Sequence, residues 1–176
     1  MTLRMLSLPR PTDTLIRHYF PDLVYGANDG IITTFAVVSG VVGADLSERV
    51  ILILGFANLL ADGISMGASN FLARRSHAEA AERADRQEAA RHGAATVVGF
   101  VTAGTIPLVA YLAPFPDSER FAAAIALTLA TLFAVGASRA LITRLGWIRS
   151  GLEMLFVGAV AAGVAYGIGA LASALT

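Results

Sequence analysis

The sequence VILILGFANLLADGISMGASNFLA (residues 50–73) is a continuous apolar run with one carboxylate, Asp62, near its middle. At 1.5 Å per residue, a helix of this length exceeds the roughly 30 Å hydrocarbon core of a bilayer. The run therefore predicts a membrane-spanning helix. A charged side chain at the centre of such a helix costs on the order of 2.5–3.5 kcal/mol by insertion scales. We expect Asp62 to face protein, water or an ion rather than lipid.

Four further runs of similar length are apolar enough to cross the same membrane: residues 25–44, 93–113, 121–141 and 152–175. Of the 176 residues in the chain, 56% are hydrophobic and only 15% are charged, which is unusual for a soluble domain. We predict an all-α polytopic membrane protein whose five transmembrane helices form one domain, residues 25–176, after an N-terminal segment of residues 1–24. Pro107 predicts a kink in the third span.

The distribution of arginine predicts the orientation of the spans. All 13 basic residues are arginine, and eleven of them lie before the first span, between the second and third, or around the connection between the fourth and fifth. Only Arg49 and Arg120 lie on the opposite side. By the positive-inside rule the N-terminus is cytoplasmic and the C-terminus is outside. The net charge of zero gives no reason to expect a nucleic-acid partner.

The first two predicted spans carry polar residues on defined faces. Asp29 lies about one turn inside the first span. On the second span, Asn58 and Asp62 are four residues apart and share a face, with Met66 beside them. Because the two helices are antiparallel, Asp29 and Met66 lie at similar depth. Two carboxylates with a thioether favour a first-row transition ion such as ferrous iron or manganese over magnesium or calcium. The four residues are therefore candidate metal ligands, although small and polar residues also serve simply to pack transmembrane helices.

Two further groups have weaker claims to function. Residues 74–92 predict a short, charged cytoplasmic helix in which His77, Glu79 and Glu82 could capture metal, or which is simply a solvated extension of the second span. Glu153 follows Arg149 by four residues, a spacing that a local ion pair explains. A role for Glu153 in a proton pathway is the alternative. The chain has no cysteine, and the predicted spans contain no histidine, so we expect neither an enzyme nor a resident cofactor.

The sequences YGANDGIITTFAVVSGVVGA (residues 25–44) and ILGFANLLADGISMGASNFLA (residues 53–73) together resemble the vacuolar iron transporter family, nearest its bacterial and nodulin-like members. The resemblance implies a homodimer whose first two spans line a pathway at the subunit interface. It also implies export of ferrous iron or manganese from the cytoplasm in exchange for protons. Asp29 matches the acid of the family's first motif and Met66 the methionine of its second.

The chain departs from the long members of that family in two respects. Asn58 stands where they carry an acid in the second span, and residues 74–92 replace their glutamate-rich metal-binding domain. The leading hypothesis is a divalent-metal/proton antiporter in a bilayer, which for this short type is a bacterial plasma membrane. The alternatives are a proton-coupled organic-cation exporter and a non-transporting membrane assembly protein whose polar faces form a dimer interface.

Overall fold

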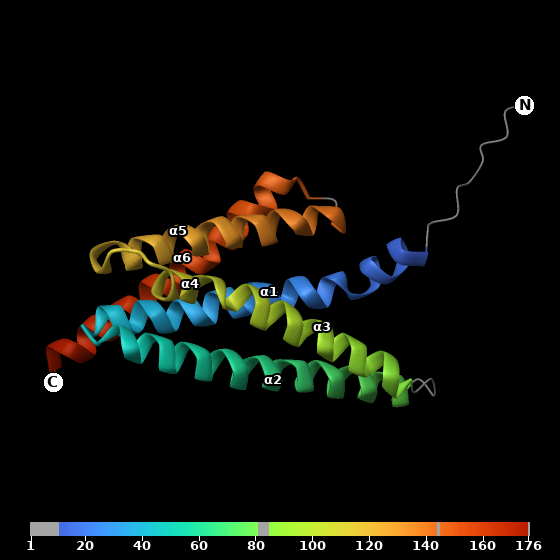
Figure 1. Ribbon diagram of the computed structural model, residues 1–176. Coiled ribbons are helices and arrows are strands. Elements are labelled where there is room, and N and C mark those ends of the chain that lie inside the picture. The colour runs from blue at the N-terminus through green and yellow to red at the C-terminus, as the bar shows by residue number, and fades with distance from the viewer. Residues whose placement is uncertain (1–10, 81–84, 144, 176) are drawn as a thin grey trace, which may run out of the picture.

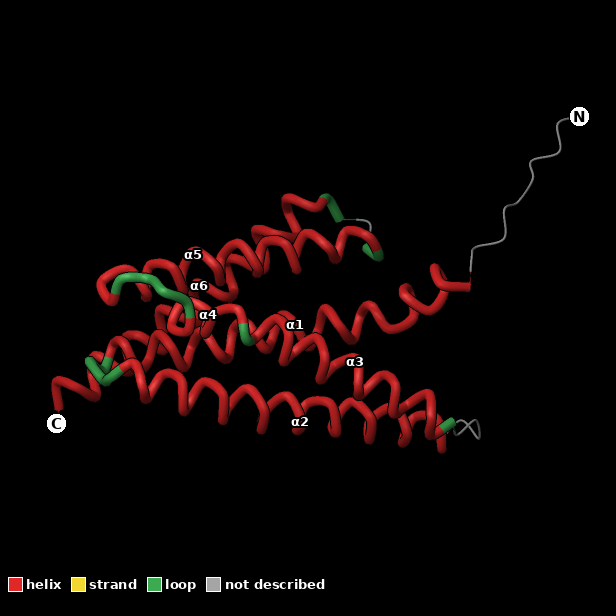
Figure 2. Tube along the Cα trace, in the orientation of Figure 1, coloured by secondary structure: helices red, strands yellow, loops and turns green. Residues whose placement is uncertain are grey.

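A computed structural model describes residues 11–80, 85–143 and 145–175. Within these residues the chain is entirely helical, and Figure 2 shows helices joined by short loops with no strand. The all-α class is therefore confirmed. The helices in chain order are α1 (Pro11–Gly43), α2 (Glu48–Ala80), α3 (Arg86–Gly104), α4 (Ile106–Leu112), α5 (Asp117–Ser138), the 3-10 helix η1 (Arg139–Leu141) and α6 (Trp147–Leu175).

Four helical stretches in the described part of the chain are long and apolar enough to cross a membrane: Glu48–Glu79, Arg86–Leu112, Asp117–Leu141 and Trp147–Leu175. They contain the second to fifth predicted spans. α1 is not among them, because Asn28, Asp29, Thr33 and Thr34 reduce its mean hydropathy. The structure is thus that of a helical protein suited to a membrane, and the first span and the orientation of the termini remain predictions.

α1 lies between two groups of helices, with α2 and α3 on one side and α5 and α6 on the other (Figure 1). Glycine allows its close contact with α3. A Cβ atom added at Gly26 or Gly30 would overlap the backbone carbonyl groups of Thr96 and Phe100. The backbones of α1 and α3 therefore meet directly, and this contact fixes the position of Asp29 relative to the third helix.

The apolar core lies on both sides of α1. One cluster joins α1 to the adjoining ends of α2, α4 and α5, and includes Phe35, Val38, Ile51 and Leu108. A second cluster joins α1 to α3, α5 and α6 and includes Ile31 and Leu132. In a bilayer, where lipid is as apolar as these side chains, their close van der Waals contacts stabilise the packing of α1 in the middle of the molecule.

The charged segment between the second and third predicted spans does not form a separate helix. Its first residues continue α2 to Ala80, because alanine, glutamate and arginine favour helix. Asp85 then begins α3 by accepting hydrogen bonds from the backbone N–H groups of Gln87 (2.9 Å) and Glu88 (3.1 Å). Glu82 lies outside the described residues.

The predicted kink at Pro107 is confirmed. The third span is divided into α3 and α4 at Thr105, two residues before the proline. Proline lacks the N–H that an uninterrupted helix would use, and its ring displaces the preceding turn. The hydroxyl of Thr105 donates a hydrogen bond to the carbonyl of Val101 at 2.7 Å.

Candidate metal sites

The first candidate site lies between α1 and α2. These helices form an antiparallel hairpin, so that Asp29 of α1 and Asp62 of α2 approach closely enough to interact electrostatically. Both side chains are partly buried. Two carboxylates held together in such surroundings repel each other unless a cation or a proton lies between them. Met66, also partly buried, lies one turn further along α2.

Two asparagines beside these acids have polar atoms without partners. Asn28 Oδ1 and Asn58 Nδ2 are buried and make no hydrogen bond within the described residues. An unpaired buried polar atom costs about 1–3 kcal/mol, so these amides are suited to contact a ligand. Asn28 was not a candidate from the sequence, although it directly precedes Asp29. The hydroxyl of Thr33 is already engaged, since it donates to the carbonyl of Asp29 at 2.9 Å.

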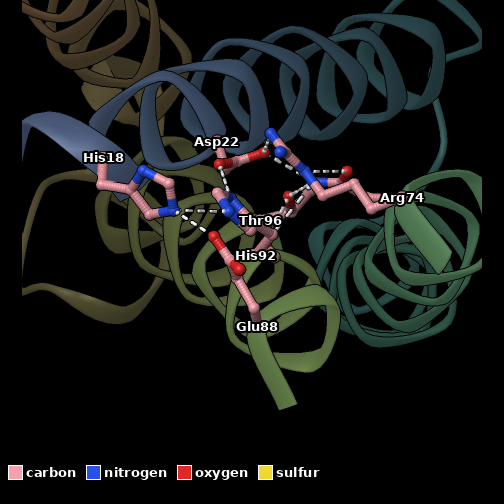
Figure 3. A network of polar contacts seen from close by, with 7 residues as sticks. His18, Asp22, Arg74, Glu88, His92 and Thr96 are labelled. Carbon is pink, nitrogen blue, oxygen red and sulfur yellow. Dashed lines mark hydrogen bonds and ion pairs between the residues drawn. The ribbon is translucent and has the colours of Figure 1, made fainter. Parts of the chain in front are cut away.

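A second polar cluster joins α1, α2 and α3 at the end of the bundle where α1 begins (Figure 3). At its centre is Asp22, which is 5% exposed. Asp22 accepts hydrogen bonds from His92 Nδ1 (2.6 Å), Asn70 Nδ2 (2.8 Å) and Arg74 (2.9 Å). Burial raises the pKa of Asp22, but the hydrogen bonds from His92, Asn70 and Arg74 outweigh burial and hold that pKa below its usual 3.8.

The outer half of this cluster consists of His18, Glu88 and His92. His18 Nε2 lies 2.8 Å from Glu88 Oε1 and 3.1 Å from His92 Nε2. The three ligand atoms all lie within 4.8 Å of one another. His92 is buried, whereas the side chains of His18 and Glu88 are 46% and 50% exposed. Histidine and carboxylate groups at these separations can hold a metal ion.

The sequence analysis did not identify this cluster. The residues named there for possible metal capture were His77, Glu79 and Glu82, but Glu79 accepts a hydrogen bond from Arg75 at 2.7 Å. His77 lines a cavity of about 260 Å³ that Glu88 and His92 also line. The sequence holds only a partial signal of this cluster, because His18 and Asp22 are four residues apart on one helix and Glu88 and His92 are four apart on another, but spacing does not show that the two pairs meet.

Glu153 lies away from both sites, near the start of α6. It accepts a hydrogen bond from Arg149 Nε at 3.1 Å, and both side chains are exposed. This is the local ion pair that the four-residue spacing predicts. The pair fully accounts for a glutamate at this position.

Comparison with known proteins identifies relatives along most of the chain. A family model described as the VIT family matches residues 20–92 and 82–170. "Vacuolar iron transporter homolog 1" of Oryza sativa is 29% identical over 164 residues, covering 82% of this chain and 70% of that protein. "Vacuolar iron transporter 1" of Arabidopsis thaliana is 24% identical over 206 residues, covering 82% of each chain. "Vacuolar iron transporter" of Toxoplasma gondii is 43% identical over 70 residues, which are 40% of this chain and 23% of that protein. The chain therefore spans less than a quarter of the Toxoplasma protein's length.

Proposed function

Because this chain belongs to the VIT family, we propose that it is a membrane transporter that exports a divalent transition metal, ferrous iron or manganese, from the cytoplasm. The names of the relatives in Oryza sativa and Arabidopsis thaliana support transport of iron. The observation that carries the proposal is the pair of partly buried acids, Asp29 on α1 and Asp62 on α2, within two helices that form one antiparallel hairpin. A dication bound there removes the repulsion between two partly buried carboxylates.

The donors around these acids favour a first-row transition ion. Carboxylate and amide oxygens alone suit magnesium, calcium or manganese. The thioether of Met66 adds a soft donor that magnesium and calcium do not exploit, which favours ferrous iron and manganese. Asn28 and Asn58 are partly buried, and Asn28 Oδ1 and Asn58 Nδ2 have no hydrogen-bond partner within the described residues, so each amide can turn an oxygen toward the same ion.

Proton antiport follows from the same two acids. When Asp29 and Asp62 are both protonated, binding of one dication releases two protons, and the site keeps the same net charge. Protons that return from the opposite side then displace the ion. The exchange is electroneutral at the site, which avoids carrying a net charge through the hydrocarbon region.

A homodimer would complete this site. Beside Asp62, α2 exposes Ala61, Ser65 and Ala68, which are three or four residues apart and therefore lie on one face. Small residues with this spacing allow two transmembrane helices to approach closely. A second copy on this face would bring two sets of acids together, and the remaining apolar surface would face lipid. We place the dimer in a bacterial plasma membrane, which the resemblance to bacterial members supports.

The test is metal flux in proteoliposomes under an imposed proton gradient. Wild type is expected to move ferrous iron or manganese only when the gradient is present. Asp29→Asn and Asp62→Asn should each abolish this flux while the protein remains folded, because an amide neither releases a proton nor balances a dication. Glu119→Gln, at an exposed position on α5, is the matched control and should transport normally.

Absence of flux of either ion in wild type would contradict the proposal. An organic-cation exporter would instead move its substrate without competition from ferrous iron or manganese. A non-transporting assembly protein would lose dimerisation in Asp62→Asn with no effect on cellular metal.

A further inference from the structure

We infer that His18, Glu88 and His92 form a second binding site, for a first-row transition-metal dication, at the end of the bundle where α1 begins. Metal binding by this cluster does not depend on transport. Its use as the entry site from the cytoplasm rests on the proposed function. The three side chains, from α1 and α3, point toward one another (Figure 3).

A hydrogen bond to Asp22 fixes the orientation of the His92 ring. Its Nδ1 lies 2.6 Å from Asp22 Oδ2, and both side chains are buried. A carboxylate only accepts hydrogen bonds, so Nδ1 carries the hydrogen and the lone pair of Nε2 is directed outward. A histidine whose second nitrogen donates to a carboxylate is the usual arrangement of metal-binding histidines in proteins. Here that arrangement is present with Nε2 facing His18 and Glu88.

The hydrogen bonds among the outer three groups do not balance. His18 Nε2 lies within reach of both Glu88 (2.8 Å) and His92 (3.1 Å). An imidazole nitrogen offers either one hydrogen or one lone pair, so His18 Nε2 can serve only one of these two partners. A dication removes the conflict, because it accepts a lone pair from all three groups at once. Ligands at about 2.0–2.2 Å from a tetrahedral ion lie roughly 3.3–3.6 Å apart, so His18 would have to move by only a few tenths of an ångström from Glu88 (2.8 Å) and His92 (3.1 Å), and all three atoms already lie within 4.8 Å of one another.

The site is also open to solvent, and the positive charge of Arg74 beside it is paired with Asp22. About half of the side-chain surface of His18 and of Glu88 is exposed, and the cavity of about 260 Å³ adjoins Glu88 and His92. Water can therefore supply the remaining ligands. Arg74 also lines this cavity, but its guanidinium donates to Asp22 at 2.9 Å and to Asn70 at 3.2 Å. Its charge is thus largely balanced by Asp22.

Two imidazoles and a carboxylate distinguish this site from the one between α1 and α2. Imidazole suits iron, cobalt, nickel and zinc and is a poor ligand for magnesium and calcium. His18 and Asp29 are both on α1, and eleven residues of helix span about 16 Å. An ion held by His18 would therefore lie about 16 Å along α1 from Asp29 of the proposed transport site.

The experiment uses Co²⁺ as the probe, because its visible absorption reports nitrogen ligation. Full-length protein is titrated in a background of Asp29→Asn with Asp62→Asn, which removes the acids of the proposed transport site. This background is expected to bind one Co²⁺ per chain. Removal of a group that only hydrogen-bonds to a metal ligand already lowers the affinity for the metal by about tenfold. His18→Ala and Glu88→Gln, which remove ligands themselves, should each weaken binding by at least about that factor. Both positions are exposed, so the variants are expected to fold.

Glu119→Gln is the matched control for Glu88→Gln and should leave the Co²⁺ affinity unchanged. His77→Ala tests whether the other exposed histidine is the ligand instead. The inference is overturned if the background binds no Co²⁺, if His18→Ala and Glu88→Gln bind it normally, or if His77→Ala alone loses it. Because the background lacks the transport acids, a failure of transport leaves this result intact, and a failure here leaves the flux result intact.

Discussion

Asp22 is the residue on which the polar contacts of α1, α2 and α3 converge, and its removal should destabilise the protein. Asp22→Asn exchanges a buried carboxylate for an amide with one acceptor oxygen, so Arg74 loses its balancing charge and either His92 or the side of Asn70 and Arg74 loses its acceptor. Since Arg74 is 41% exposed and water can replace part of what it loses, we expect a cost of about 1–3 kcal/mol. Thermal unfolding in detergent should show a melting temperature lower by several degrees. Asp45→Asn, in the exposed turn after α1, is the matched control and should melt as wild type does; an equal melting temperature for both variants would contradict the prediction.

Candidate site residues could be recognised from the sequence where a single helix contained the whole pattern of polar residues within an apolar run. Asp29 and Asp62 stand out because each is an acid within an apolar run, and the hairpin of α1 and α2 brings them together. The cluster of His18 and His92 could not be predicted in the same way. Its members are 74 residues apart, and their approach depends on the glycine contact between α1 and α3. No pattern within one helix contains that information.

Among the helices, the contact of α1 with α3 leaves no room for added volume at its glycines. Gly30→Ala adds a Cβ atom that would overlap the backbone of Phe100, so the two helices must separate. We expect a loss of about 1–3 kcal/mol in stability from overpacking. Metal flux should also fall, because Gly30 adjoins Asp29. Gly163→Ala in α6 meets nothing within 4 Å and should be neutral or stabilise by up to about 1 kcal/mol. Equal melting temperatures for the two variants would show that α1 and α3 can move apart freely.

The elements themselves followed from the sequence to different degrees. The break before Pro107 and four of the apolar helices could be predicted, because proline chemistry and hydropathy act locally. The continuation of α2 to Ala80 agrees with the interpretation of residues 74–92 as an extension of the second span, but the sequence did not indicate that α3 begins within them, at the cap of Asp85. The polar residues of α1 that identify the candidate site are also what removes α1 from the set of clearly apolar spans.

For the whole molecule, the question is whether α1 crosses the membrane, and the sides of the membrane on which the two termini lie test it. The four apolar stretches alone would place both ends of the chain on one side, whereas a fifth crossing by α1 places them on opposite sides. In the structure, α1 begins at the opposite end of the bundle from the end of α6 (Figure 1). By the positive-inside rule, the arginine distribution predicts a cytoplasmic N-terminus. Alkaline phosphatase fused after Thr176 should therefore be active in a bacterial host, and green fluorescent protein at the same position should be dark. A control fusion after Ala80, at the end of α2 that is predicted to be cytoplasmic, should give the reverse result. A fluorescent C-terminal fusion would mean an even number of crossings and would remove Asp29 from the membrane.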